Sequence, residues 1–320
     1  MTEPSAAAGR ADHEGRAGGA DRDCADHAAA GRAELTAAVV RSFAQTPDPR
    51  LRELLQALVR HLHAFVEETG LTLPEWAAAV DFLTATGQRS DAKRQEFILL
   101  SDVLGVSSLA ESVNHNTGLG ETESTVLGPF HVVASPPRRL GDDIAVSGAG
   151  TAVSGERCVV TGRVLSTDGS PLPGATIDVW QADGEGFYDV QVPEAMDEGS
   201  LRGLFEADGE GRFWFRTVVP KHYAIPTDGP VGALLGASAR HPYRPAHIHM
   251  IGAAPGREPV TTHVFVAGSP YIDGDAVFGT KDSLVREFEL VEDAQAAARF
   301  SVEAPFRHVE FDLVLPPRAG

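Results

Sequence analysis

The stretch "CVVTGRVLSTDGSPLPGATIDVWQAD", residues 158–183, decides the fold class of this chain. Apolar and polar residues alternate along much of it, which is the pattern of strands with one buried and one exposed face. An Asp-Gly pair and a Pro-Leu-Pro-Gly run interrupt the alternation, and both are typical of turns. The stretch therefore predicts short strands joined by a turn-rich loop.

Further short strands are predicted toward the C-terminus. The patterns that indicate them are "GRFWFRTVVP" at 211–220, "THVFVAG" at 262–268 and "HVEFDLVLP" at 308–316. Several short strands separated by turns are typical of an antiparallel sandwich. We therefore expect residues 134–320 to form a β-sandwich domain.

The preceding segment, residues 34–133, has the pattern of helices. In "LRELLQALVRHLHAFVEE", residues 51–68, apolar side chains recur every three or four positions, as on one face of an amphipathic helix. "TLPEWAAAVDFL", residues 72–83, opens with Thr72 and Glu75 at the spacing of a capping box. A third apolar stripe follows in residues 91–113. The expected fold class is α+β, with a helical domain followed by an antiparallel β-sandwich.

Residues 1–33 consist mainly of Ala, Gly, Asp and Arg and offer little apolar surface to bury. Burial of so little surface cannot offset the entropy lost on ordering a chain. We expect these residues to form a disordered tail.

The overall composition excludes several classes of protein. The formal net charge of -18 argues against nucleic-acid binding, which needs a basic surface. No apolar run is long enough to span a membrane, and the N-terminus lacks the apolar stretch of a secretory signal. The chain has two cysteines, too few for a disulfide framework, which fits a reducing cytoplasm.

The stretch "HPYRPAHIHM", residues 241–250, concentrates three histidines, a tyrosine and an arginine. On a strand, His247 and His249 would point to one face and Ile248 to the other. Two imidazoles on one face could bind a metal ion. They could equally be solvated surface histidines, and the His-x-His spacing leaves both interpretations open.

Two of the four tyrosines lie next to turns, Tyr188 in "GEGFYDVQ" and Tyr223 in "KHYAIPTDGP". Two phenolates and two imidazoles would suit Fe(III) better than Zn(II) or Mg(II). Phenolate ligation requires a highly charged cation, since the ordinary pKa of tyrosine is about 10. Spacing along the sequence does not establish that the four residues meet, and half-buried packing tyrosines are the alternative.

The order Tyr188, Tyr223 and "RPAHIH", residues 244–249, together with "DVWQAD" and "GFYDVQ", resembles the intradiol ring-cleavage dioxygenases. These are non-haem Fe(III) enzymes that split catechols between the two hydroxyl groups. The similarity runs from about residue 34 to the C-terminus. It implies a β-sandwich catalytic domain and a helical domain that forms a homodimer interface, where some relatives hold a lipid.

The resemblance also implies roles for individual residues. Tyr188, Tyr223, His247 and His249 would bind one Fe(III) per subunit. Tyr223 would leave the metal and accept a proton when a catecholic substrate binds, and Arg244 would stabilise the charge that builds up on the ring during attack on O2. The alternative for Arg244 is a surface ion pair, and the alternative for the whole domain is a sandwich that only binds ligands.

Three loops resemble the hydroxyquinol 1,2-dioxygenase branch more than the catechol 1,2-dioxygenase branch: "TESTVLGPFH", "YAIPTDGPVG" and "DAVFGTKDSLV". Catechol itself remains the alternative substrate. Asp102 could accept a hydrogen bond from a third ring hydroxyl, or it could be an ordinary aspartate on a helix surface. The residues expected around the substrate ring are Leu99, Asp102, Val126, Leu127, Gly128, Pro129, Phe130, Ile225, Pro226 and His263.

Overall fold

A computed structural model describes residues 17–91, 94–115, 118–128, 130–131, 135–146 and 153–318. The chain divides into two compact units between Asp81 and Phe82. Each unit is described by itself.

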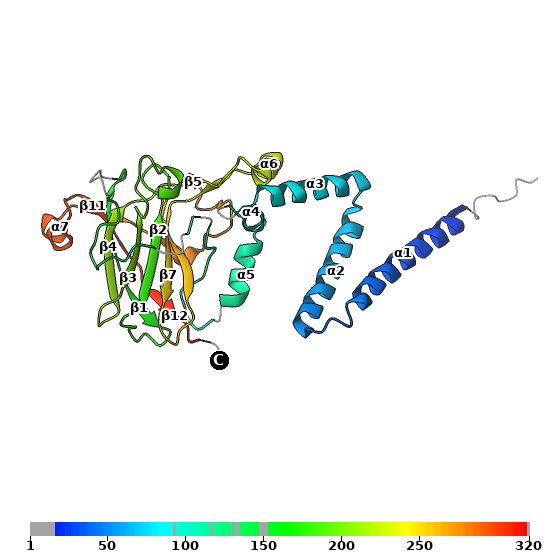
Figure 1. The fold of residues 1–320 in the computed structure, drawn as a ribbon, viewed down its shortest axis with the longest axis horizontal. Helices are drawn as coiled ribbons and strands as arrows, with labels where there is room; N and C mark the ends of the chain where they lie inside the picture. The colour runs from blue at the N-terminus through cyan, green and yellow to red at the C-terminus, as the bar shows by residue number, and fades with distance from the viewer. Residues whose placement is uncertain are drawn as a thin grey trace, which may run out of the picture. The chain divides into compact units, whose positions relative to one another are not determined.

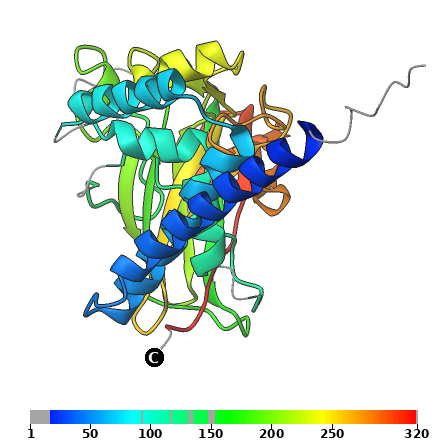
Figure 2. The same cartoon turned by 90° about the vertical axis from the view of Figure 1, so that its right-hand side faces the viewer.

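The first unit contains the helices α1 (Ala17–Ser42) and α2 (Pro49–Thr69) and the start of α3 (Leu73–Arg89). The hairpin of α1 and α2 is visible in Figure 1, and α1 lies in front of α2 in Figure 2. Asp48 caps α2 by accepting hydrogen bonds from two backbone N–H groups of its first turn. The predicted capping box is present at the start of α3, where the Thr72 N–H donates to Glu75 at 2.8 Å and the Glu75 N–H donates to Thr72 at 3.4 Å.

The prediction of a disordered tail over residues 1–33 is wrong for residues 17–33, which lie in α1. Alanine, the strongest helix former, is abundant in this segment, because an alanine side chain loses no rotamer freedom in a helix. Backbone propensity therefore decides the conformation where little apolar surface is available. Residues 1–16 of the predicted tail lie outside the described residues.

The second unit is built around two five-stranded sheets (Figure 1). The first sheet has the order β10-β11-β1-β12, and β4 also pairs with β1; its strands are β1 (Arg157–Ser166), β4 (Arg212–Val218), β10 (Glu289–Val291), β11 (Phe306–Glu310) and β12 (Leu313–Leu315). The second has the order β3-β2-β7-β8-β9; its strands are β2 (Thr176–Gln181), β3 (Arg202–Glu206), β7 (His247–Ala253), β8 (Val260–Val266) and β9 (Val285–Arg286). A separate ribbon consists of β5 (Tyr223–Ala224) and β6 (Tyr243–Arg244).

The predicted α+β fold class, with helices followed by a β-sandwich, is confirmed. Pairing is antiparallel between β2 and β3, β2 and β7, β7 and β8, β1 and β4, and β10 and β11. The sheets are mixed, however, because β1 pairs in parallel with β11 and β12, and β8 pairs in parallel with β9. These partners of β1 come from the C-terminal segment, which returns to the first strand of the domain.

The inner faces of the two sheets form the main hydrophobic core. Alternate residues of each strand point into it, such as Ile177 and Val179 of β2 and Ile248 and Met250 of β7. The intervening residues of β2 and β7 therefore point to the outer face of the second sheet. This outer face is where the histidines of the "HIH" stretch lie.

The outer face carries a second hydrophobic cluster. It combines side chains of α4 (Glu96–Val103) and α6 (Pro230–Ala237) with Trp180 and both tyrosines of the predicted metal site. The second compact unit begins at Phe82 and so includes α4, whereas the predicted domain boundary was at 133/134. The remaining helices are α5 (Val106–His115) and α7 (Ala294–Phe300).

Within the described part of the chain, no helix combines the length and apolar character needed to cross a bilayer.

Gly162 of β1 provides a test of the sandwich packing. A Cβ atom there would overlap the carbonyl oxygen of Phe311 and lie 2.8 Å from the Phe213 ring. We expect Gly162→Ala to lower the free energy of unfolding by about 1–3 kcal/mol, as overpacked core substitutions do. Chemical denaturation measures this change. The control is Gly236→Ala in α6, where nothing lies within 4 Å of the added atom and the free energy of unfolding should stay the same or rise. Equal changes in the free energy of unfolding for the two substitutions would contradict the close packing described around Gly162.

Candidate metal and substrate site

A row of polar and aromatic side chains crosses the outer face of the second sheet. The strand register places Arg202 opposite Trp180, Trp180 opposite His249, and His249 opposite His263. His247 lies on the same strand face as His249, two residues earlier, as the alternation of β7 predicted. These side chains are buried, with 2% of His247 and 1% of His249 exposed. The alternative of solvated surface histidines is therefore wrong.

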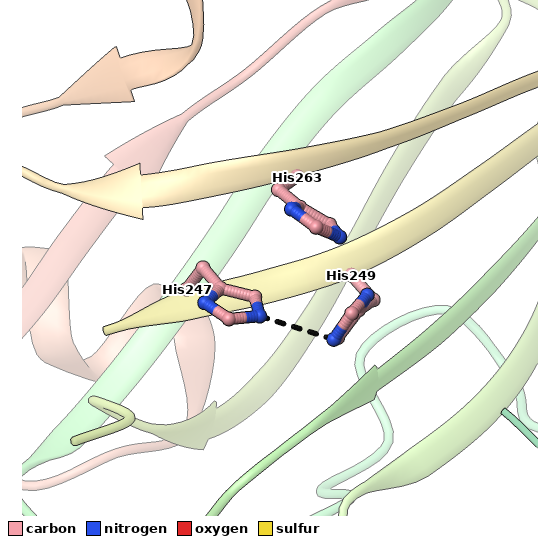
Figure 3. Close-up of side chains that lie close together, drawn as sticks. All are labelled: His247, His249 and His263. Carbon is pink, nitrogen blue, oxygen red and sulfur yellow. Dashed lines mark hydrogen bonds between the residues drawn. The ribbon is translucent and has the colours of Figure 1, made fainter. Parts of the chain in front are cut away.

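The two histidines of β7 face each other with their Nε2 atoms 3.0 Å apart (Figure 3). The Nδ1 atom of His247 lies 2.7 Å from the Pro245 carbonyl oxygen, which can only accept, so Nδ1 carries the proton. In the neutral ring, Nε2 of His247 then has a free lone pair. That lone pair points toward the second imidazole.

Both predicted tyrosines reach the same place. The Tyr188 hydroxyl lies 3.1 Å from Nε2 of His249. Tyr223 reaches the site from β5, and its ring centroid lies 5.3 Å from that of Tyr188 and 5.6 Å from that of His247. The structure thus brings together the four residues that sequence spacing alone could not place in contact.

The electrostatics of the site oppose charge on these groups unless a cation is present. Burial first, and then the neighbouring Tyr223, raise the pKa of Tyr188 well above its ordinary value. Burial and the Arg244 charge lower the pKa of His247 to about 3, and burial and the neighbouring histidines hold the pKa of His249 well below its usual range. The imidazoles are therefore neutral, with lone pairs available to a metal. A phenolate at Tyr188 would require a highly charged cation beside it.

These observations show that the residues present fit a metal ion. Two phenol oxygens and two imidazole nitrogens converge in a buried site, and the tautomer of His247 leaves its facing nitrogen without a proton. A mixed phenolate and imidazole donor set is suited to Fe(III).

His263 is the third histidine within 4.8 Å of the other two (Figure 3). Its ring stacks on that of His247, with centroids 4.5 Å apart. Nδ1 of His263 lies 3.4 Å from a guanidinium nitrogen of Arg244, which can only donate. The same guanidinium also lies 3.3 Å from Nε2 of His247, so this contact does not by itself set His263 apart from His247.

Arg244 is buried, with 1% exposed, and it is therefore not a surface ion-pair residue. Its Nη1 atom lies 3.4 Å from the Tyr223 hydroxyl and 3.3 Å from Nε2 of His247. Its opposite edge pairs with the buried carboxylate of Asp275. Burial lowers the pKa of Arg244, but Asp275 and the tyrosines outweigh it and raise the pKa above its ordinary value, so the guanidinium keeps its charge.

Most residues predicted around the substrate ring lie in or beside the cluster that contains the tyrosines. Leu99, Val126 and Ile225 are buried members of that cluster. Phe130 stacks on Tyr188 with a centroid distance of 4.5 Å. Gly128 has a φ of +78°, and a Cβ atom there would lie 3.0 Å from the His249 ring.

The other predicted pocket residues differ in their surroundings. Asp102 is 3% exposed, so it is not a helix-surface aspartate, and burial raises the pKa of its carboxyl group against a hydrogen bond from Ser107. Leu127 is 43% exposed and Pro226 is half-buried. Pro129 lies outside the described residues.

Sequence reasoning missed three features that hold the site. The indole of Trp180 stacks on the His249 ring at 4.6 Å and 10°. Asp189, next to Tyr188, forms a buried ion pair with Arg202, with an N–O distance of 2.6 Å. Asp275 pairs with Arg244 from a loop distant in sequence. The "DVWQAD" and "GFYDVQ" motifs contained the first two signals, but no local pattern marks Asp275.

Comparison with known proteins agrees with this geometry. A family described as "Dioxygenase" matches residues 128–317, and one described as "Catechol dioxygenase N terminus" matches residues 48–122. A hydroxyquinol 1,2-dioxygenase of a Rhizobium species is 49% identical over 278 residues, covering 87% of this chain and 92% of that protein. The chain belongs to the intradiol ring-cleavage dioxygenases.

Two further members of the family are close to this chain. A 6-chlorohydroxyquinol 1,2-dioxygenase of Cupriavidus pinatubonensis is 48% identical, covering 88% of this chain and 96% of that protein. The crystal structure of a hydroxyquinol 1,2-dioxygenase from Pseudomonas putida superposes with a TM-score of 0.82 at 42% identity, covering 90% of this chain and 99% of that one. The chain is thus an intradiol ring-cleavage enzyme, and it spans nearly the full length of these relatives.

The buried histidines predict an acid-sensitive fold in the metal-free protein. The unfolded chain takes up protons near the ordinary histidine pKa of about 6.5, whereas burial holds the pKa of His247, His249 and His263 below that value in the folded chain. The free energy of unfolding is therefore unaffected by these histidines above about pH 6.5. Below that pH it declines, by up to about 1.4 kcal/mol per pH unit for each histidine, because only the unfolded chain takes up the protons.

We expect His263→Gln to weaken this dependence. Between about pH 6.5 and pH 5, the loss in free energy of unfolding should be smaller than in the wild type by up to about 1.6 kcal/mol, because one buried histidine has been removed. Denaturant titrations of metal-free protein measure it. The exposed His61→Gln in α2 is the control and should behave like the wild type. If the free energy of unfolding of His263→Gln depended on pH as it does in the wild type, His263 would not contribute to the acid sensitivity.

Proposed function

We propose that this enzyme is a hydroxyquinol 1,2-dioxygenase that binds one Fe(III) per subunit through Tyr188, Tyr223, His247 and His249. Its substrates would be benzene-1,2,4-triol (hydroxyquinol) and O2. The observation that carries the proposal is the meeting of two phenol side chains and two imidazole nitrogens in a buried site. The buried carboxyl group of Asp102 is close enough to Arg244 of this site for their charges to interact. The identities of 48–49% to proteins named for hydroxyquinol substrates support the choice of ring.

Bound Fe(III) would supply a Lewis acid that holds both adjacent ring hydroxyls and makes the ring reactive toward O2. Both oxygen atoms enter the product, so hydroxyquinol and O2 together account for all atoms of 3-hydroxy-cis,cis-muconate, the enol form of maleylacetate. No other oxidant or reductant is consumed.

The side chains of the protein would handle protons and charge. Tyr223 reaches the site from the β5–β6 ribbon, and as a phenolate it would accept a proton from a substrate hydroxyl at its Oη atom. Arg244 presents the N–H groups of Nη1 toward the same region and keeps its charge, so it can stabilise negative charge that develops on the ring. Phe130 and the buried apolar residues of α4 would exclude water from the ring.

Asp102 supports hydroxyquinol over catechol. Its side chain is buried next to Leu99 and Val103, which belong to the cluster around the tyrosines. A carboxyl group there can accept a hydrogen bond from a third ring hydroxyl. Catechol lacks that hydroxyl and would leave the group without this partner, which costs about 1–3 kcal/mol or more.

The helix α2 supports a homodimer formed through the helical unit. Within α2, no residue is buried in the single chain, and its apolar stripe is about half exposed, including Leu54 at 50%, Leu58 at 53% and Leu62 at 53%. A regular apolar stripe on an uncovered helix favours packing against another helix. A second copy of this chain would supply it.

Removal of the proposed ligands tests the metal site. Tyr188→Phe, His247→Ala and His249→Ala should each lose bound iron and the phenolate-to-iron absorption in the visible region, because each loses a ligand atom. Tyr243→Phe on β6 is a matched control, since it removes a phenol near the site that is stacked on Tyr271. Iron analysis and absorption spectra measure the outcome. Full iron content in Tyr188→Phe would disprove the ligand assignment.

The substrate proposal predicts a ratio of specificity constants. We expect kcat/KM for hydroxyquinol to exceed that for catechol by about tenfold or more, the factor that corresponds to 1.4 kcal/mol. Asp102→Asn should reduce this ratio, because an amide replaces the carboxyl acceptor. Oxygen uptake with hydroxyquinol, 6-chlorohydroxyquinol and catechol measures it. Equal efficiency of the wild type on catechol would assign the enzyme to the catechol branch.

A further inference from the structure

We infer that Asp275 is a positioning residue, which holds the Arg244 guanidinium so that one corner of it faces the substrate ring. The inference rests on the proposed function, because it concerns the charge that Arg244 stabilises during ring cleavage. It starts from a buried ion pair behind the ligand set. Both side chains of this pair are 1% exposed.

The guanidinium of Arg244 and the carboxylate of Asp275 make a forked, bidentate contact. Nε of Arg244 donates to Oδ1 of Asp275 at 3.0 Å, and Nη2 donates to Oδ2 at 3.1 Å. Two parallel hydrogen bonds fix the plane of a guanidinium as well as its position. A single bond would leave the group free to rotate about it.

The carboxylate itself is held by its own loop. The Val277 N–H donates to Oδ1 at 3.2 Å, and the Gly279 N–H donates to Oδ2 at 3.1 Å. Each carboxylate oxygen therefore accepts one backbone bond and one guanidinium bond. A Cβ atom on Gly279 would lie 2.9 Å from Nη2 of Arg244, so the loop approaches the guanidinium as closely as a glycine allows.

The bidentate contact uses Nε and Nη2 of Arg244 and leaves Nη1 to face the proposed metal and substrate site. Nη1 does not contact Asp275 in the fork and lies 3.4 Å from the Tyr223 hydroxyl and 3.3 Å from Nε2 of His247. Nη2 also lies 3.4 Å from Nδ1 of His263. These contacts are longer than the hydrogen bonds to Asp275, so the carboxylate, and not the ligand residues, sets the orientation.

Charge leads to the same conclusion. A buried guanidinium without a counter-ion would move toward the nearest anion, and a Tyr223 phenolate is the nearest candidate. Asp275 supplies a permanent counter-ion on the side away from that tyrosine. The carboxylate thus balances the charge of Arg244 and keeps the contact with Tyr223 at the longer distance of 3.4 Å.

The test is Asp275→Asn in the full-length, iron-loaded enzyme with hydroxyquinol as substrate. We expect kcat to fall by about 10–100-fold, the usual effect of losing a group that orients a functional residue. KM should change less than threefold (about 0.7 kcal/mol), and iron content should match the wild type. The control is Asp312→Asn, which removes the carboxylate of a partly exposed Arg–Asp pair on the first sheet, with an N–O distance of 2.9 Å. Its kcat should be unchanged.

A double-mutant cycle shows whether Asp275 acts through Arg244. If it does, Asp275→Asn combined with Arg244→Lys should be no slower than Arg244→Lys alone, because the forked contact is already lost. If the fold-losses in kcat of the two single variants multiplied in the double variant, the Asp275 carboxylate would act independently of Arg244. That result would overturn the inference.

Two further measurements separate positioning from folding. Thermal unfolding of the iron-free variants shows whether Asp275→Asn is folded. If it is not, Gly279→Ala replaces it, since the added Cβ would lie 2.9 Å from Nη2 of Arg244 and 3.1 Å from Oδ2 of Asp275 and would disturb the forked contact without removing either side chain. This variant should also lower kcat with little change in KM. Unchanged kcat per bound iron in the folded variant would overturn the inference, whereas a wild type inactive on every catecholic substrate would refute the proposed function instead.

Discussion

The site depends on one constraint: imidazole nitrogens and a phenol oxygen, whose lone pairs water would normally hydrate, face one another in a buried place. Nε2 of His247 and Nε2 of His249 are 3.0 Å apart, and the Tyr188 hydroxyl is 3.1 Å from the second of these. Such a meeting is unfavourable unless a cation or a set of protons lies between the donors. The surrounding structure must therefore hold each group firmly in place, and most of the features around the site do so.

Each member of the site is held by a different kind of contact. The Pro245 carbonyl sets the tautomer of His247, and the Trp180 indole sets the plane of the His249 ring. Buried ion pairs hold the segments on either side, Asp189 with Arg202 and Asp275 with Arg244. A buried charge without its partner is strongly destabilising, so these pairs position neighbouring residues with little freedom.

The fold explains why such a site can exist on a sandwich. The inner faces of the two sheets form the apolar core, so the outer face of the second sheet is available for polar side chains. Helices α4 and α6 cover that face and keep it from solvent. Asp102 is buried on α4, and the proposed preference for a third hydroxyl rests on this residue.

The sequence by itself determined the order of helices and strands, the capping box of α3 and the common face of His247 and His249. These follow from local propensity and from the period of two residues along a strand. Only the tertiary structure decided that Tyr188 and Tyr223 meet those histidines, that Asp102 is buried, and that Asp275 pairs with Arg244. Contacts between segments distant in the chain depend on how the strands and loops pack, which leaves no periodic pattern in the sequence. The helix at residues 17–33 was missed because composition measures what a segment can bury and not how readily alanine forms a helix.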